Sequence, residues 1–82
     1  MKQIFYEYFQ LYNIPQELRA DCNELTIVNL GTSNAIVDGL ELAPGDQYYS
    51  PGNEQETNTT RYRLSFTAGG TNIVLAVRKI YK

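Results

Sequence analysis

The chain is built around LTIVNLGTSNAIVDGLELAPGDQYY, residues 25–49. Residues 25–30 and 35–37 are rich in β-branched side chains, which are stiff and pack well on a pleated surface. Four consecutive turn-prone residues, 31–34, separate the two runs. This spacing predicts two strands joined by a hairpin loop.

Two turn dipeptides divide the rest of this stretch. Asp38-Gly39 tolerates a positive φ and predicts a bend or a bulge, whereas Pro44-Gly45 suits a type II turn. The strands that these turns delimit are residues 40–42 and 46–49. The chain therefore reverses too often here for a helix of useful length.

Two longer strands are predicted in the last third of the chain. RYRLSFT, residues 61–67, alternates strictly and directs Tyr62, Leu64 and Phe66 inward. The final strand spans residues 73–81, and its first five positions are all apolar, as in a strand buried on both faces. A glycine-rich hairpin loop is expected between the two strands.

The first twelve residues, MKQIFYEYFQLY, form the most aromatic segment. A helix would align some of its rings in a stripe, but the abundance of aromatic residues favours a strand. Rings on both faces indicate either a strand covered on both sides, in part by a neighbouring subunit, or an edge strand whose tyrosine hydroxyls meet water. We expect this segment to be the association surface, through Ile4, Phe5, Tyr6, Tyr8, Phe9 and Tyr12. A chain lacking residues 1–12 is expected to fold without assembling.

The connecting segments are polar. Residues 13–24 form a connection in which Pro15 suits the start of a single helical turn over residues 16–19. Cys22 lies in this connection without a histidine to activate it. Residues 50–60, SPGNEQETNTT, are the longest polar run and predict a surface loop.

The size of the chain points to association. Its 82 residues provide one domain, residues 1–82, with limited capacity to bury apolar surface. Small domains compensate with disulfides, a metal or association, yet this chain has one cysteine and no histidine. We therefore predict an oligomer or a docked subunit.

The usual chemistry of enzymes and ligand sites is missing from the sequence. Histidine is absent, and no phosphate-binding or dinucleotide-binding motif occurs. Asp46, Glu54 and Glu56 match no calcium-loop spacing. The net charge of −2 argues against a nucleic-acid partner, and no apolar run is long enough to span a membrane. We expect no enzymatic activity, no cofactor and no bound metal, in a protein made in a cytoplasm.

An alternative function is a soluble module that binds carbohydrate or peptide. Aromatic side chains at a surface stack on sugars, although tryptophan is absent here. The candidates for such a platform are Tyr6, Tyr8, Tyr12, Tyr48 and Tyr49.

The pattern of turns and strands also resembles a known class of proteins. The motifs are Leu25-Thr26-Ile27-x-Asn29-x-Gly31, Val37-x-Gly39-x-x-Leu42-x-Pro44-Gly45, and Pro51-Gly52-Asn53. Over residues 25–82 the chain resembles small β-sandwich structural proteins of tailed bacteriophages, such as the crAss-like phages of Bacteroidetes. The resemblance implies a virion component without catalytic residues, either an auxiliary or decoration protein of the capsid or a protein associated with a fibre.

Together these observations predict an all-β protein, an antiparallel β-sandwich of six or seven strands. The expected function is that of a structural virion protein made in the host cytoplasm. Its expected partners are itself and capsid or fibre proteins, reached through β-strand and aromatic contacts.

Overall fold

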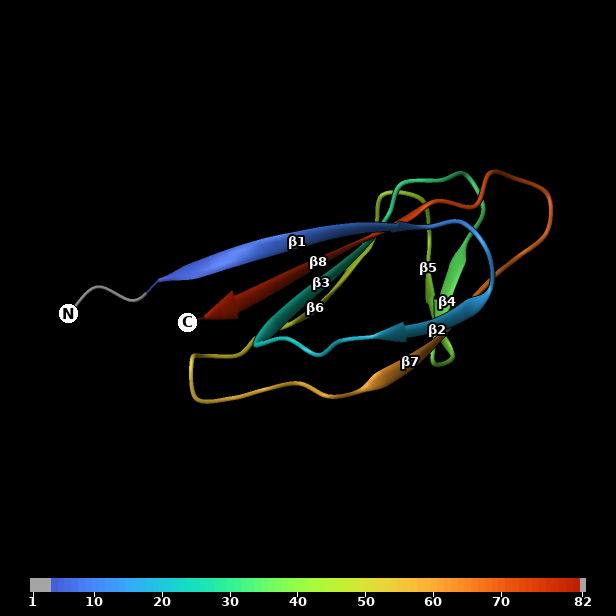
Figure 1. The fold of residues 1–82 in the computed structure, drawn as a ribbon. Helices are drawn as coiled ribbons and strands as arrows, with labels where there is room; N and C mark the ends of the chain where they lie inside the picture. The colour runs from blue at the N-terminus through green and yellow to red at the C-terminus, as the bar shows by residue number, and fades with distance from the viewer. Residues whose placement is uncertain (1–3, 82) are drawn as a thin grey trace.

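The computed structural model describes residues 4–81, so residues 1–3 of the aromatic segment and residue 82 lie outside the description. Eight strands form two four-stranded antiparallel sheets that stack as a sandwich (Figure 1). Sheet A has the order β1-β8-β3-β6 and comprises β1 (Phe5–Tyr12), β8 (Val74–Tyr81), β3 (Glu24–Asn29) and β6 (Gln47–Ser50). Sheet B has the order β2-β7-β4-β5 and comprises β2 (Gln16–Arg19), β7 (Arg61–Phe66), β4 (Ala35–Val37) and β5 (Leu40–Leu42).

The predicted fold class is confirmed, and the strand that the sequence did not predict is β2. The helical turn expected over residues 16–19 is wrong, because these residues pair with β7, with Leu18 opposite Tyr62. Leu18 and Ala20 are buried whereas Arg19 is exposed, which is the two-residue period of a strand. Pro15 suits this strand as well as a helix, since a proline is tolerated at the start of an edge strand.

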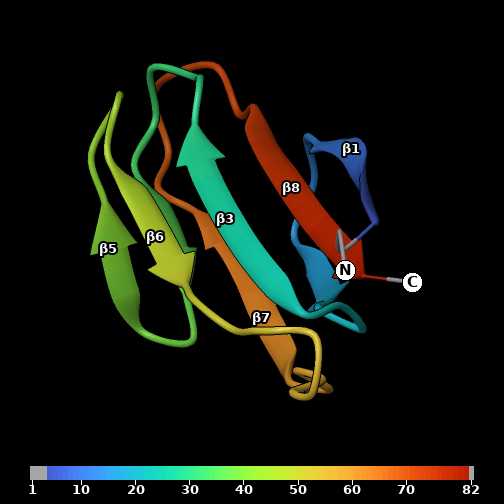
Figure 2. The same cartoon turned by 90° about the vertical axis from the view of Figure 1, so that its left-hand side faces the viewer.

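Both predicted hairpin loops are wrong, because each connects strands of different sheets. Residues 31–34 lead from β3 in sheet A to β4 in sheet B, and residues 68–72 lead from β7 back to β8. The two crossing segments lie side by side at one end of the sandwich (Figure 2). There, the amides of Thr32 and Ser33 both donate to the carbonyl of Thr71, at 3.0 and 3.1 Å.

Asn29 holds this crossing in place from inside the protein. Its Nδ2 donates to the carbonyls of Ser33 (2.8 Å) and Leu42 (2.9 Å), and its Oδ1 accepts from the amide of Gly31 (3.0 Å). A buried amide side chain is tolerated when its donors and acceptor are satisfied in this way. One side chain therefore ties the end of β3 to the crossing loop and to β5.

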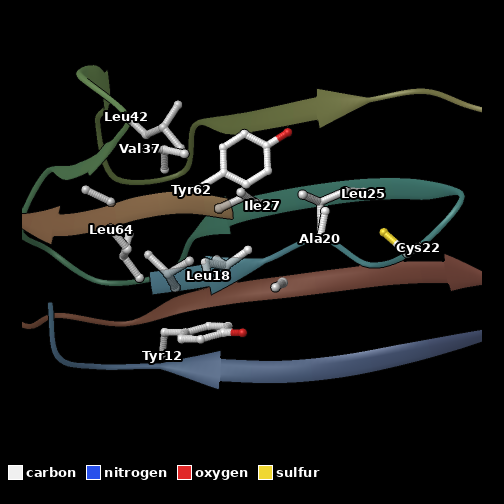
Figure 3. Packing of buried hydrophobic residues seen from close by; sticks show 13 residues of the cluster. Tyr12, Leu18, Ala20, Cys22, Leu25, Ile27, Val37, Leu42, Tyr62 and Leu64 are labelled. Atoms are coloured by element: carbon white, nitrogen blue, oxygen red, sulfur yellow. The ribbon is translucent and has the colours of Figure 1, made fainter. Parts of the chain in front are cut away.

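The core lies between the sheets and draws on both of them (Figure 3). The largest fully buried apolar side chains are Leu18, Leu25, Ile27, Leu64 and Val74. The inward orientation predicted for β7 is confirmed, since Tyr62 and Leu64 are buried and Phe66 packs against the core.

Arg78 links the two sheets at the corner between β8 and the end of β2. Its Nε donates to the carbonyls of Arg19 (2.9 Å) and Ala20 (3.1 Å). Its two Nη atoms donate to Gln10 Oε1 (3.0 Å) and to the hydroxyl of Tyr12 (2.6 Å). This contact fixes the C-terminal end of β1 against the sandwich.

The polar loop of residues 50–60 is also held to the body of the protein. The Nδ2 of Asn23 donates to the carbonyls of Asn53 (3.1 Å) and Glu56 (2.6 Å). Backbone hydrogen bonds join Cys22 and Asn58 in an isolated bridge. These contacts hold the loop against the segment that precedes β3, in a molecule whose overall dimensions are 49 × 18 × 16 Å.

Candidate interaction surface

The pairing register determines which residues of sheet A face the core and which face away from it. On β8, Val74 and Ala76 are fully buried, so the alternate residues Leu75 and Val77 point to the opposite side. Directly paired residues share a face, and Leu11 is opposite Leu75 on the neighbouring strand. The side of sheet A that faces away from sheet B, termed the outer face, carries these residues.

The middle of the outer face gathers apolar side chains from all four strands, with the polar residues Thr26 and Gln47 among them. Two neighbouring rows cross it, and in each row the residues are direct pairing partners. The rows are Phe9, Val77, Thr26 and Tyr49, and next to them Leu11, Leu75, Val28 and Gln47. Phe9 and Leu11 are each 64% exposed, and no other strand within residues 4–81 lies over this face.

A charged row bounds the apolar rows on one side. Lys79 stands between Glu7 on β1 and Glu24 on β3. Its Nζ lies 4.1 Å from the ring centroid of Phe5 and 5.2 Å from that of Tyr81. A hydrogen bond with Tyr81 raises the pKa of Lys79 above its ordinary value, so this group stays cationic over the physiological range.

Tyr49, on the edge strand β6, is a further polar group at the border of the outer face. A hydrogen bond with Glu24 raises the pKa of the Tyr49 hydroxyl above its ordinary value, and the residual burial acts in the same direction. The tyrosine is therefore neutral at physiological pH and has a defined polar partner. The outer face is thus an apolar area with polar, hydrogen-bonded groups on its rim.

The corresponding face of sheet B is different in character. Its outward residues include Glu17 and Arg63, which are direct pairing partners, and Arg19 and Arg61, which form the next pair. Arg19 Nε also lies 3.4 Å from Glu17 Oε1. Sheet B therefore presents charge to solvent where sheet A presents apolar side chains, so the two sides of the sandwich are not equivalent.

The residues predicted as the association surface do not all share one face. Phe5 and Phe9 lie on the outer face, whereas Tyr6 and Tyr8 lie on the other side of β1, with their ring centroids 5.3 Å apart. Ile4 precedes the strand and is exposed. Tyr12 is in the core, 5% exposed, so it is not available at the surface of this chain.

β1 itself is a strand, as predicted, and it lies at the edge of sheet A. The sequence allowed either a strand covered on both sides or an exposed edge strand. Residues 4–11 are exposed, so in the single chain this segment is an edge strand. Sequence reasoning missed the contribution of Val28, Leu75 and Val77. The apolar run at residues 73–77 was the signal that could have revealed them. Its residues on the outer face are half-buried, although no other part of residues 4–81 covers that face.

The five tyrosines considered as a sugar platform are dispersed. Tyr12 is buried, and Tyr48 packs edge-on against Tyr62 at a centroid distance of 5.7 Å on the inner side of sheet A. Tyr49 lies on the outer face, opposite to the side that carries Tyr6 and Tyr8. No single surface therefore contains all of them.

Apart from the outer face, the described residues form open grooves and bury one thiol. An open groove of about 410 Å³ lies between β1 and residues 19–21, and one of about 520 Å³ follows β2 and β7. Among residues 4–81 no group of three or more cysteine, aspartate or glutamate side chains is placed to hold a metal. Burial raises the pKa of the Cys22 thiol, with Arg78 acting in the opposite direction.

No family model, curated protein or solved structure matches this chain. Within the described residues there is also no helix of the length and apolarity needed to cross a membrane.

Proposed function

We propose that this protein is a structural component of a phage particle that docks on a capsid or fibre protein through the outer face of sheet A. The observation that carries the proposal is the set of apolar side chains that all four strands of that sheet contribute to this face. The phage context comes from the resemblance of residues 25–82 to small β-sandwich virion proteins. The proposal includes no catalytic step.

The physical reason is the cost of leaving such a face in water. Burial of apolar surface contributes about 25 cal/mol per Å², and large exposed apolar patches rimmed by polar groups are typical of protein interfaces. Phe9 and Leu11 are the most exposed apolar side chains of the outer face and are suited to fill pockets of a partner. Glu7, Lys79 and Glu24 at the rim would set the orientation of docking through their alternating charges.

The character of the remaining surface supports a docking role over catalysis. Cys22, the one thiol, is buried and has a raised pKa, which disfavours the reactive thiolate. Arginine and carboxylate side chains line both open grooves. The outer face is thus the feature that a function has to explain.

The test is incorporation into particles. The wild-type protein is expected in purified phage particles at a fixed copy number, measured by quantitative mass spectrometry. Val77→Lys places a charge in the middle of the outer face and is expected to reduce incorporation at least tenfold. Ser65→Lys is the matched control, because Ser65 faces outward at a central position of sheet B.

Two results would contradict the proposal. Equal incorporation of both variants would remove the outer face from the docking mechanism. Absence of the wild-type protein from particles, together with retention on a polysaccharide or peptide array, would replace the structural role with that of a soluble binding module.

A further inference from the structure

The backbone of β1 has one side that β8 does not use. The carbonyl of Lys79 accepts from the amide of Asn23 (2.9 Å), and the amide of Tyr81 donates to Asn23 Oδ1 (2.9 Å). The odd-numbered residues of β8 therefore direct their backbone groups towards β3, and the even-numbered ones towards β1. Arg78, for example, pairs with Tyr8.

The register between β1 and β8 determines which residues of β1 direct their backbone groups away from the sheet. Even-numbered residues of β1 are opposite even-numbered residues of β8, so they are the ones that hydrogen-bond to it. The alternate residues then present their N–H and C=O groups along the open edge. These residues are Phe5, Glu7, Phe9 and Leu11.

This edge lacks the features that normally prevent strands from pairing. Short strands, prolines, lysines and bulges are the common protections of an edge. The other three edge strands, β2, β5 and β6, are four, three and four residues long, whereas β1 has eight residues. Within β1 there is no proline and no basic residue, and Glu7 is its one charged side chain.

We propose that β1 pairs antiparallel with β1 of a second copy of this chain, about a two-fold axis at Tyr8. In this register Phe5 is opposite the second copy's Leu11, and Glu7 is opposite the second copy's Phe9. Each of these pairs exchanges two backbone hydrogen bonds, as hydrogen-bonded antiparallel pairs do. The interface is isologous, so the same edge serves both chains.

Charge and hydrogen bonding select this register among the alternatives. Residues that direct their backbone groups to the open edge must be opposite one another, so the axis passes through a residue of β1. An axis at Glu7, Tyr8 or Phe9 pairs the most of these residues. An axis at Glu7 opposes two like charges and leaves Leu11 without a counterpart in the strand. An axis at Phe9 leaves Phe5 without one, whereas the axis at Tyr8 pairs all four outward residues.

The pairing has a consequence for the outer face. Opposed residues of paired strands point to the same side, so the outer faces of both copies join into one surface across an eight-stranded sheet. This inference rests on the proposed role in assembly but uses the edge of β1 instead of the outer face. The two proposals therefore fail separately, because Val77→Lys does not alter the edge.

Native mass spectrometry and light scattering of the full chain test the pairing. A dimer is expected at micromolar concentration. Glu7→Pro removes one outward N–H while leaving the bonds to β8 and is expected to abolish the dimer. Glu7→Gln, which keeps the N–H, is the matched control and is expected to remain dimeric. A wild-type chain that stays monomeric up to millimolar concentration would overturn the proposal.

A cross-linking experiment tests the register even if Glu7→Pro fails to fold. In a Cys22→Ala background, Tyr8→Cys is expected to form an intermolecular disulfide under a glutathione redox buffer, because opposed residues at the axis are within disulfide reach. Gln10→Cys, which is opposite the second copy's Tyr6, is expected not to cross-link. Equal cross-linking of both, or of neither, would overturn the register.

Discussion

At the scale of single residues, buried polar groups determine how this small fold is held together. Asn29 satisfies three backbone groups from the core, and Asn23 joins the polar loop to sheet A through two carbonyls. Arg78 lies among backbone carbonyls and the hydroxyl of Tyr12, so its charge is solvated by the protein. A chain with so little core thus relies on side chains that bridge distant segments.

Cys22 allows a prediction about the dependence of stability on pH. Because burial raises the pKa of this thiol, the native state retains the proton at a pH where the unfolded state loses it. The free energy of unfolding should therefore fall as pH rises through the unfolded pKa of about 8.5, by at most about 1.4 kcal/mol per pH unit. Below that pH the thiol contributes no such dependence.

Urea unfolding at pH 7 and pH 10 measures this effect. Cys22→Ala is expected to lose less stability between the two conditions than the wild-type chain. All other titratable groups are the same in the two proteins, so the difference isolates the thiol. Identical losses would show that the thiol ionises equally in the two states.

At the scale of elements, two of the crossings between the sheets are the parts that local patterns misassigned as hairpins. Four turn-prone residues between apolar runs indicate a hairpin, yet residues 31–34 and 68–72 each carry the chain to the other sheet. The strands on either side of each crossing pair with distant partners, because this buries both apolar faces in one core. The crossings then contact each other closely enough to exclude a side chain.

Gly31 is where this contact is closest. A Cβ on this residue would lie 2.1 Å from the carbonyl oxygen of Thr71, which is backbone and cannot move aside as a side chain would. Gly31→Ala is expected to lower the free energy of unfolding by about 2 kcal/mol or more. Gly39→Asn is the control and is expected to cost less, because that position is open and asparagine adopts a positive φ more readily than most side chains. Equal stability of the two variants by chemical denaturation would contradict the close crossing.

At the scale of the whole molecule, the sandwich has one polar and one apolar outer side. β8 carries apolar side chains on both of its faces, which predicts that both faces are buried. Sheet B covers only the inner face. The proposed docking partner would cover the outer face. The proposed second copy would enlarge that face by joining its own outer face to it. Under these proposals the first part of the aromatic segment mediates assembly, whereas Tyr12 belongs to the core.

This division changes what a truncation should do. Deleting residues 1–10 is expected to give a folded but monomeric chain, because Tyr12 remains in the core beneath Arg78. Deleting residues 1–12 also removes that buried ring and should cost about 3–5 kcal/mol more, as for other buried aromatic side chains. Thermal unfolding and light scattering of both truncated chains check the prediction, which equal stabilities would contradict.

Local patterns were sufficient for the fold class and for seven of the strands, because alternation and turn dipeptides act within a few residues. They were insufficient for β2, whose Leu18 becomes recognisable as a strand residue only opposite Tyr62. They also placed Tyr12 on the association surface with Phe9, although Arg78, far away in sequence, holds it in the core. Sheet membership, the exposed face and the open edge all depend on which distant strands pair, and that choice follows from burying the most apolar area in one core.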